Sequence, residues 1–146
     1  MAVKPIPDGY RSVTPYLRVR NAAKLVEFLK KSFDGRATEC HTGDDGTVHH
    51  AEVRIGDSMV MVGEASQGKP PIPAGIYLYV TDTDANYKRA LAAGATSLLE
   101  PSNQFYGDRN AGVKDAFDNE WWIATHVEDV SPEEMERRAK AHMKKT

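Results

Sequence analysis

The chain has 146 residues, 40% hydrophobic and 27% charged, which is the composition of an ordinary globular protein. Its 19 Lys and Arg residues nearly balance its 21 Asp and Glu residues, and a net charge of −2 argues against proteins that act by gripping nucleic-acid phosphates. No apolar run approaches the roughly 18 residues that cross a membrane. Only one cysteine, Cys40, is present, which excludes an internal disulfide framework and is typical of the cytosol. We therefore expect a cytoplasmic protein without nucleic-acid or membrane partners.

The first half of the chain alternates one helix with short extended runs. Asn21 occupies an N-cap position, and the helix that follows is expected to end at Asp34 and Gly35. The stretch Gly43-Asp44-Asp45-Gly46 has the composition of a hairpin turn. Strands are expected at residues 13–19, 36–42, 48–55 and 59–62, from alternation of apolar and polar residues.

The same pattern begins again after a linker at residues 65–73 that contains three prolines. Asp82 or Thr83 caps a second helix, which Gly94 ends. Strands are expected at residues 76–80, 97–99 and 121–125 and inside 105–114. Ser131, followed by Pro132 and by Glu134, has the form of a capping box and predicts a third helix.

The two halves correspond at one constant offset. Val19 ends the first strand of the first half and Val80 ends that of the second, and the two residues are 61 positions apart. Asp57 and Asp118, in the turns before the last strands, have the same separation. A shared offset at both places indicates an internal duplication.

The predicted fold class is therefore α+β. Two βαβββ modules, about residues 11–64 and 74–127, form one domain over residues 1–130. The C-terminal helix occupies residues 131–146 and either packs on its own domain or contacts a second copy.

Duplicated modules of this kind resemble the vicinal oxygen chelate superfamily of glyoxalases, bleomycin-resistance proteins and dioxygenases, and in detail its PhnB-like branch. The resemblance covers about residues 11–138 and rests on four segments, in order: Val13-Thr14-Pro15-Tyr16-Leu17, His50 to Ser58, Gln104 to Arg109, and Trp121 to Val130. It implies that curved mixed sheets form an open cup that binds a small molecule. It also implies a homodimer.

Metal-using members of the superfamily hold a divalent ion in the cup through the first and last strands of each module. The corresponding positions in this sequence are Thr14, Met61, Gly75 and Trp122. None is a good ligand, since glycine has no side chain and tryptophan offers only an N–H donor. We therefore expect no metal and no other cofactor, and no metal-dependent glyoxalase or dioxygenase activity.

His50 and Glu52 are candidates for acid–base work because they share one face of a strand. The alternative is that this face, which also carries Arg54, is simply exposed to solvent. A second conceivable cluster consists of His41, His50 and Glu52. The alternative is that these are simply polar residues on a partly exposed hairpin.

Tyr106 and Arg109 are the remaining catalytic candidates. Arg109 is suited to clamp a carboxylate or phosphate, or else to pair with an aspartate and brace its loop. For ligand binding we expect residues of the aromatic and Met-rich cup: Trp122, Met61, Thr14, Tyr77 and His126.

The sequence thus favours a protein that binds a small aromatic or apolar molecule without metal. Arg109 or His50 at the rim of the cup is expected to orient a polar, at most singly anionic, group. The alternative is a superfamily enzyme, lyase, isomerase or dioxygenase-like, with an atypical active site. Whether the protein is an enzyme stays open at this point.

Overall fold

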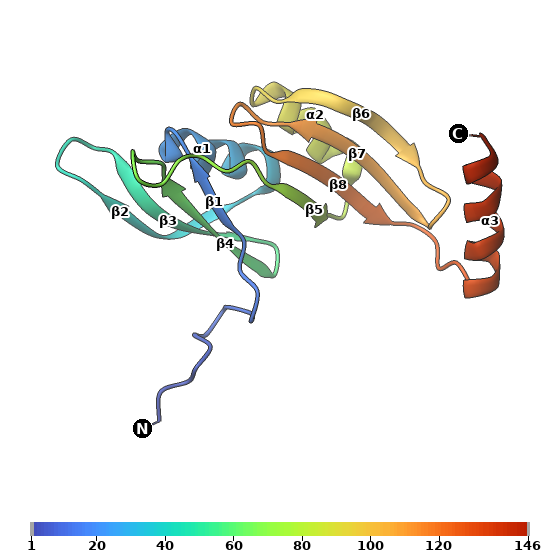
Figure 1. Ribbon diagram of the computed structural model, residues 1–146, viewed down its shortest axis with the longest axis horizontal. Coiled ribbons are helices and arrows are strands. Elements are labelled where there is room, and N and C mark those ends of the chain that lie inside the picture. Colours follow the sequence, from blue (N-terminus) through green and yellow to red (C-terminus); the bar gives the residue numbers. More distant parts are fainter. Residues whose placement is uncertain (1, 146) are drawn as a thin grey trace.

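The computed structural model describes residues 2–145 and contains two four-stranded sheets (Figure 1). The strand order is β1-β4-β3-β2 in the first sheet and β5-β8-β7-β6 in the second. Within each sheet the first and last strands of the module pair in parallel, and the other neighbours pair antiparallel. Two βαβββ modules and a C-terminal helix are therefore present, and the predicted α+β fold is confirmed.

The first module contains β1 (Tyr16–Val19), α1 (Ala22–Phe33), β2 (Arg36–Thr42), β3 (Val48–Ile55) and β4 (Ser58–Glu64). Asn21 caps α1 as predicted, because its side chain accepts a hydrogen bond from the Lys24 amide. The helix ends at Asp34, whose backbone is left-handed with φ 56°. A row of apolar residues on α1 is buried against the sheet.

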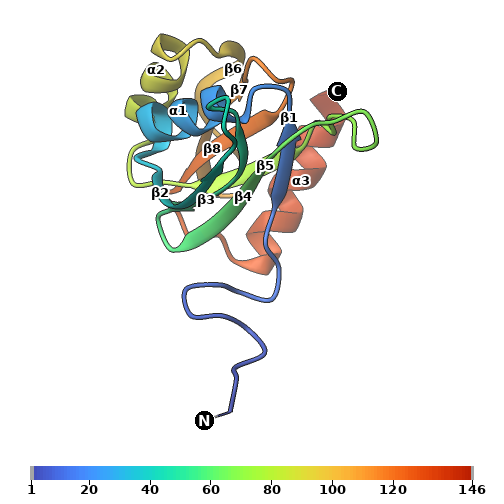
Figure 2. The same cartoon turned by 90° about the vertical axis from the view of Figure 1, so that its left-hand side faces the viewer.

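The second module contains β5 (Gly75–Tyr79), α2 (Thr83–Ala92), β6 (Thr96–Asn103), β7 (Asp108–Lys114) and β8 (Glu120–His126). Asp82 caps α2 by accepting from the Ala85 amide. Seen from the end, α1 and α2 group together on one side of the strands (Figure 2). The face of each sheet that lies opposite its helix is called the open face below.

The strand register repeats with the predicted offset. Tyr16 faces Met61 across β1 and β4, and Tyr77 faces Trp122 across β5 and β8. Each residue of the second pair lies 61 positions after its counterpart in the first. The third strand of each module departs from this offset, because β7 corresponds to β3 at an offset of 60 residues. Counted between corresponding residues, the connection between β7 and β8 therefore contains one residue more than that between β3 and β4.

Two strands differ in length from the sequence expectation. β1 begins at Tyr16 and not at residue 13, since Pro15 has no amide hydrogen to donate to a ladder. β6 extends to Asn103, well beyond the expected residue 99, and includes Pro101. Proline is tolerated there because β6 lies at the edge of its sheet, and the β6–β7 register is irregular around it.

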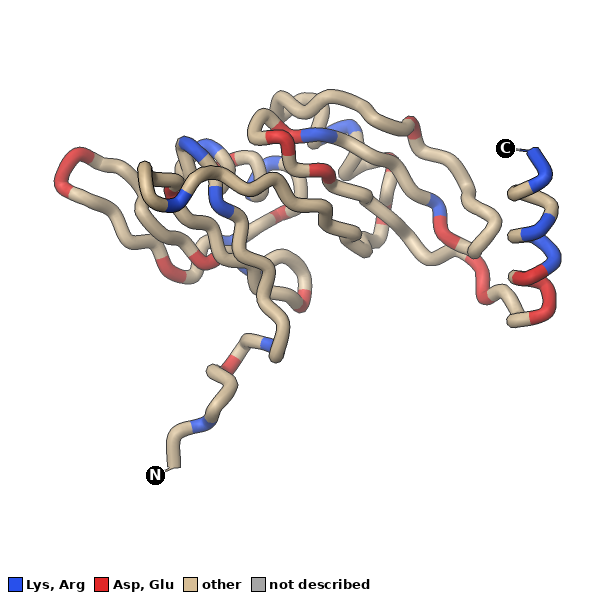
Figure 3. The backbone as a smooth tube through the Cα atoms, viewed as in Figure 1, with Lys and Arg blue, Asp and Glu red and all other residues tan. Residues whose placement is uncertain are grey.

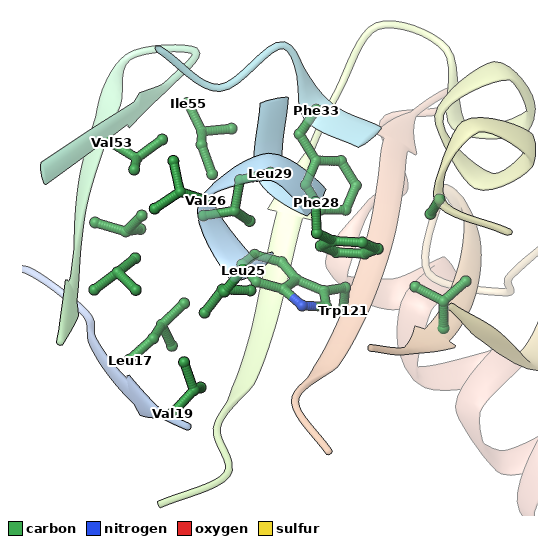
Figure 4. Close-up of a cluster of buried hydrophobic side chains, with 14 of the residues drawn as sticks. Leu17, Val19, Leu25, Val26, Phe28, Leu29, Phe33, Val53, Ile55 and Trp121 are labelled. Carbon is green, nitrogen blue, oxygen red and sulfur yellow. The ribbon is translucent and has the colours of Figure 1, made fainter. Parts of the chain in front are cut away.

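The two modules share one hydrophobic core. Trp121 is fully buried and its ring lies 5.2 Å from that of Phe33 and 6.4 Å from that of Phe28, both on α1 (Figure 4). The core therefore runs from the second sheet into the first helix. Asn86 of α2 reinforces this contact by donating to the Ser32 carbonyl at 2.8 Å.

The third helix, α3 (Pro132–Lys145), stands beyond the ends of β7 and β8 (Figure 1). Acidic residues begin it and basic residues follow toward its end (Figure 3). Arg138 ties it to its own chain through the Phe105 carbonyl and the Glu128 carboxylate. No residue of α3 that the structure describes is buried, and no helix within residues 2–145 is long and apolar enough to cross a membrane.

Candidate functional site

The open face of the second sheet carries aromatic and polar side chains, and not the aliphatic residues of the core. Strand alternation sends Trp121 and Ile123 into the core and turns Trp122 and His126 to the open face. The residues of β5 and β7 on the same face, which pair with Trp122, Ala124 and His126, are Tyr77, Tyr79, Asp108, Asn110 and Gly112. The predicted ligand-binding residues Trp122, Tyr77 and His126 thus lie on one surface.

Asp108 is the centre of this surface, although the sequence analysis gave it no role in binding. Its side chain is only 5% exposed. Oδ2 accepts the hydroxyl hydrogens of Tyr77 at 2.7 Å and Tyr79 at 2.9 Å. Oδ1 lies 2.9 Å from His126 Nδ1. Three side chains from β5 and β8 therefore converge on one buried carboxylate at the start of β7.

These neighbours stabilise the ionised form of Asp108. Burial alone would raise the pKa of Asp108, but the hydrogen bonds from His126, Tyr77 and Tyr79 outweigh it and the pKa is lowered. The pKa of Tyr77 is raised, mainly by burial, and that of Tyr79 is raised by its hydrogen bond to Asp108. At neutral pH the carboxyl is ionised and both phenols keep their protons.

His126 bridges two carboxylates. Its Nδ1 meets Asp108, and its Nε2 lies 2.7 Å from Oδ1 of the fully exposed Asp129. The pKa of His126 is raised, first by Asp108 and then by Asp129, which favours the doubly protonated ring. The imidazolium then donates to both carboxylates.

Asn110 extends the hydrogen bonding along β7. Its side-chain amide donates to the hydroxyl oxygens of Tyr106 at 2.8 Å and Tyr77 at 3.3 Å. Its own carbonyl accepts from Gln104 at 3.0 Å. Tyr106, a predicted catalytic candidate, therefore belongs to the same cluster.

Trp122 lies flat on the sheet because its cross-strand neighbour is glycine. A Cβ placed on Gly112 would come within 2.5 Å of the indole ring. The indole N–H donates to Glu120 at 3.3 Å. Trp122 is half-buried, and Tyr77 and Tyr79 beside it are 44% and 61% exposed.

The open face of the first sheet contains a hollow of about 440 Å³. Thr14, Met61 and Glu52, all predicted site residues, line it together with Glu39 and Tyr10. Burial first, and then the hydrogen bond to Glu52, raises the pKa of Tyr10 to about 12. Hydrogen bonds with Glu39 and Tyr10 lower the pKa of Glu52.

His50 lies on this open face beside two other rings. Its ring centroid is 5.9 Å from that of Tyr16 and 6.0 Å from that of His41. His41 in turn lies 3.1 Å from a carboxylate oxygen of Glu39. Both histidines are thus near the hollow, and His41 and its partner are exposed.

Arg109 lies on the opposite face of the second sheet, toward α2. It forms two hydrogen bonds to Asp84, from Nε at 2.7 Å and from a terminal nitrogen at 2.9 Å. It also donates to Asn103. Of the two sequence interpretations, the structure shows Arg109 pairing with an aspartate, and it keeps Arg109 apart from the other site residues.

The sequence pattern of the Glyoxalase/Bleomycin resistance protein/Dioxygenase superfamily matches residues 11–123. The chain belongs to this superfamily. An uncharacterized protein of Mycobacterium bovis is 35% identical over 136 residues, which cover 86% of this chain and 90% of that one. An uncharacterized protein of Mycobacterium tuberculosis shows the same identity, with 80% of its own length covered.

Solved structures of the superfamily share the fold at lower identity. TioX from Micromonospora sp. superposes with a TM-score of 0.65 at 22% identity, over 80% of this chain and 100% of that one. The fosfomycin resistance protein FosX from Mesorhizobium loti has a TM-score of 0.59 at 16% identity, over 79% and 91%. At these identities the likeness shows the fold alone.

The superfamily resemblance implies that Thr14, Met61, Gly75 and Trp122 stand where metal-using members have their ligands. Met61 and Trp122 are equivalent in register, facing Tyr16 and Tyr77 respectively. Within residues 2–145 no group of three or more His, Cys, Asp and Glu side chains is arranged to hold a metal ion. These residues do not fit the divalent ion of the metal-using members.

Sequence reasoning missed Tyr10, Glu39, Tyr79 and Asn110 and gave Asp108 no binding role. Tyr79 and Asp108 had a signal, because each lies two residues along its strand from a residue on the open face. Tyr10 had none, since it belongs to the irregular segment before β1 and reaches β3 only in the folded chain.

Proposed function

We propose that this protein binds a small molecule with a flat aromatic or apolar body, without metal, on the open face around Trp122. Within the superfamily we place it in the PhnB-like branch. The observation that carries the proposal is that the Trp122 ring lies over Gly112 on the open face, at a position where the superfamily resemblance implies a metal ligand.

Flat rings favour this surface for two physical reasons. Burying apolar area contributes about 25 cal/mol per Å², and Trp122, Tyr77 and Tyr79 leave ring faces open to solvent. Offset or edge-to-face contacts between rings add about 0.5–1.5 kcal/mol.

We propose that a second copy of the chain completes the cup, making the protein a homodimer. The segment before β1 lies against part of the open face of the first sheet, but Tyr16, Tyr77 and Tyr79 are exposed on the two open faces. Thr14 and Met61 would then contribute to the same ligand site as Trp122. Sedimentation equilibrium at tens of micromolar should give twice the mass of the chain (micromolar-scale association), and a monomer would contradict the dimer.

We also propose that the protein works in the cytoplasm, which its single cysteine, Cys40, favours.

A superfamily enzyme with an atypical site is the second candidate. The observation that favours it is the contact of Glu52 with the Tyr10 phenol inside the hollow of the first sheet, because a carboxylate beside a phenol is an acid–base pair. Glu52→Gln separates the two functions. An enzyme that uses Glu52 as acid or base would lose turnover in Glu52→Gln and still bind ligand, whereas a protein that only binds has no turnover in either form.

The binding function is tested by tryptophan fluorescence titration with 2-naphthalenemethanol, with and without EDTA. We expect the same affinity in both conditions, because no metal is required. Trp122→Phe should abolish most of the fluorescence response, since the remaining tryptophan is Trp121, which is fully buried. A loss of binding in EDTA, or an unchanged response in Trp122→Phe, would overturn the proposal.

A further inference from the structure

We propose that the ligand approaches Trp122 with a positively charged nitrogen, a protonated amine, and not with a carboxylate. This inference rests on the proposed function, since it names the class of ligand for the same surface. It follows from an inventory of hydrogen-bond donors, which shows what polar chemistry the surface has left to offer.

The two tyrosines of β5 have already used their hydrogens. Each hydroxyl carries one hydrogen, and both are donated to Oδ2 of Asp108. Tyr106, the third phenol of the cluster, is hydrogen-bonded to Tyr77 and accepts from Asn110. The Tyr77 oxygen also accepts from Asn110 and Tyr106, so what the pair presents to a ligand is the lone pairs of Tyr79 and the ring faces of both tyrosines.

The nitrogens of the surface are committed in the same way. His126 is hydrogen-bonded to Asp108 through Nδ1 and to Asp129 through Nε2. Both hydrogens of the Asn110 amide go to tyrosine oxygens. The Trp122 N–H is directed to Glu120. A ligand carboxylate would find acceptors around it and would lose its hydration without replacement.

A protonated amine, in contrast to a carboxylate, would find favourable partners on this surface. Tyr77 and Tyr79 form an edge-to-face pair with ring centroids 5.4 Å apart, and Tyr79 is 61% exposed. An ammonium group over such rings is attracted by their π electrons, and its N–H groups can donate to the phenol oxygen of Tyr79. The carboxylates of Asp108 and Asp129 add negative charge behind and beside the rings, against the single positive charge of His126.

Basic side chains do not counter this field at the tyrosine pair. Arg109, which the sequence offered as a clamp for an anion, points to the other face and is bound by Asp84. Lys114 shares the open face of β7 and lies two residues from Gly112, the partner of Trp122, but it is six residues from Asp108, about 20 Å along the strand. Among the described residues, the expected anionic group of the ligand thus has no free basic partner at the pair of Tyr77 and Tyr79, whereas Lys114 lies at the other end of the surface.

The test uses three probes of matched shape in EDTA: 2-naphthylmethylammonium, 2-naphthalenemethanol and 2-naphthoate, measured by isothermal titration calorimetry on the full chain. We expect the ammonium to bind roughly 5- to 30-fold more tightly than the alcohol, and the carboxylate to bind more weakly than the alcohol. A carboxylate that binds as tightly as the ammonium would overturn the inference while leaving the proposed function intact. If none of the three probes binds, both the inference and the proposed function are contradicted.

Tyr79→Phe assigns the effect to the phenol oxygen. It keeps the ring and removes the acceptor, and because Tyr79 is exposed the fold should persist, which circular dichroism checks. The preference for ammonium over alcohol should fall at least threefold. Tyr87→Phe is the matched control, since Tyr87 lies on α2 and its hydroxyl bonds Ser97 away from the open face. An equal loss in both variants, or none in Tyr79→Phe, would refute the assignment.

Discussion

The indole of Trp122 rests on Gly112, its direct partner across β7 and β8. Any side chain at residue 112 would collide with the ring, so this glycine decides how the aromatic face is presented. Gly112→Ala should lower the free energy of unfolding by about 1–3 kcal/mol, the usual cost of overpacking, and weaken binding of 2-naphthalenemethanol. Urea unfolding and calorimetry measure the two effects.

Gly75→Ala is the matched control for that prediction. Gly75 is also in a strand of the second sheet, but a Cβ there meets no atom within 4 Å. Its free energy of unfolding should change by less than about 0.5 kcal/mol. Equal costs in the two variants would mean that the contact between Gly112 and Trp122 is not what matters.

Asp115 holds the turn between β7 and β8. It is buried and accepts four hydrogen bonds, from the Phe117 and Asn119 amides, the Asn119 side chain and the indole of Trp121. Asp115→Ala leaves these donors unpaired and should cost about 2–4 kcal/mol in thermal unfolding. Asp57→Ala, in the equivalent turn of the first module, should cost less than about 0.5 kcal/mol, and a similar loss there would contradict this account.

Asp118 has a left-handed backbone, with φ 68°. Glycine adopts that conformation without strain. Asp118→Gly should therefore raise the free energy of unfolding by about 0.5–1 kcal/mol. Asp44→Gly, at an exposed position without positive φ, should not stabilise the protein. If both variants behave alike, backbone strain at Asp118 is not the cause.

His126 should titrate above the ordinary histidine value of about 6.5, because Asp108 and Asp129 favour its charged form. A raised pKa in the folded state means that the interaction stabilises the fold fully below pH of about 6.5 and is lost as pH rises through the folded pKa. NMR titration of the ring should show the raised value, and Asp108→Asn should lower it. A wild-type His126 that titrates at or below 6.5 would contradict the pairing.

The duplicated fold could be predicted because local patterns repeat at a fixed spacing. Asn21 and Asp82 cap their helices 61 residues apart, and the parallel register follows the same offset. The extra residue before β8 could not be seen, since Asp118 seemed to match Asp57 directly. Its presence is a matter of strand register, which depends on pairing across the sheet.

The candidate site could be predicted only in part, for a related reason. Alternation along β8 separated Trp121 from Trp122, and that separation needs only one strand. The pairing of Asp108 with Tyr77 and Tyr79 joins residues about 30 positions apart, and the partner of Arg109 proved to be Asp84 on a helix. Such contacts depend on the packed tertiary structure, and no local pattern specifies them.

The central claim, metal-free binding of a flat ligand on the face of Trp122, is tested most directly by the two indole N–H signals in an NMR spectrum. Trp121 and Trp122 give one signal each, and they lie on opposite faces of the same strand. In EDTA, 2-naphthylmethylammonium should shift the Trp122 signal and leave that of Trp121, which is buried and bonded to Asp115, in place. A Trp122 signal that stays unmoved at saturating ligand, or that moves only when a divalent metal is supplied, would contradict the claim.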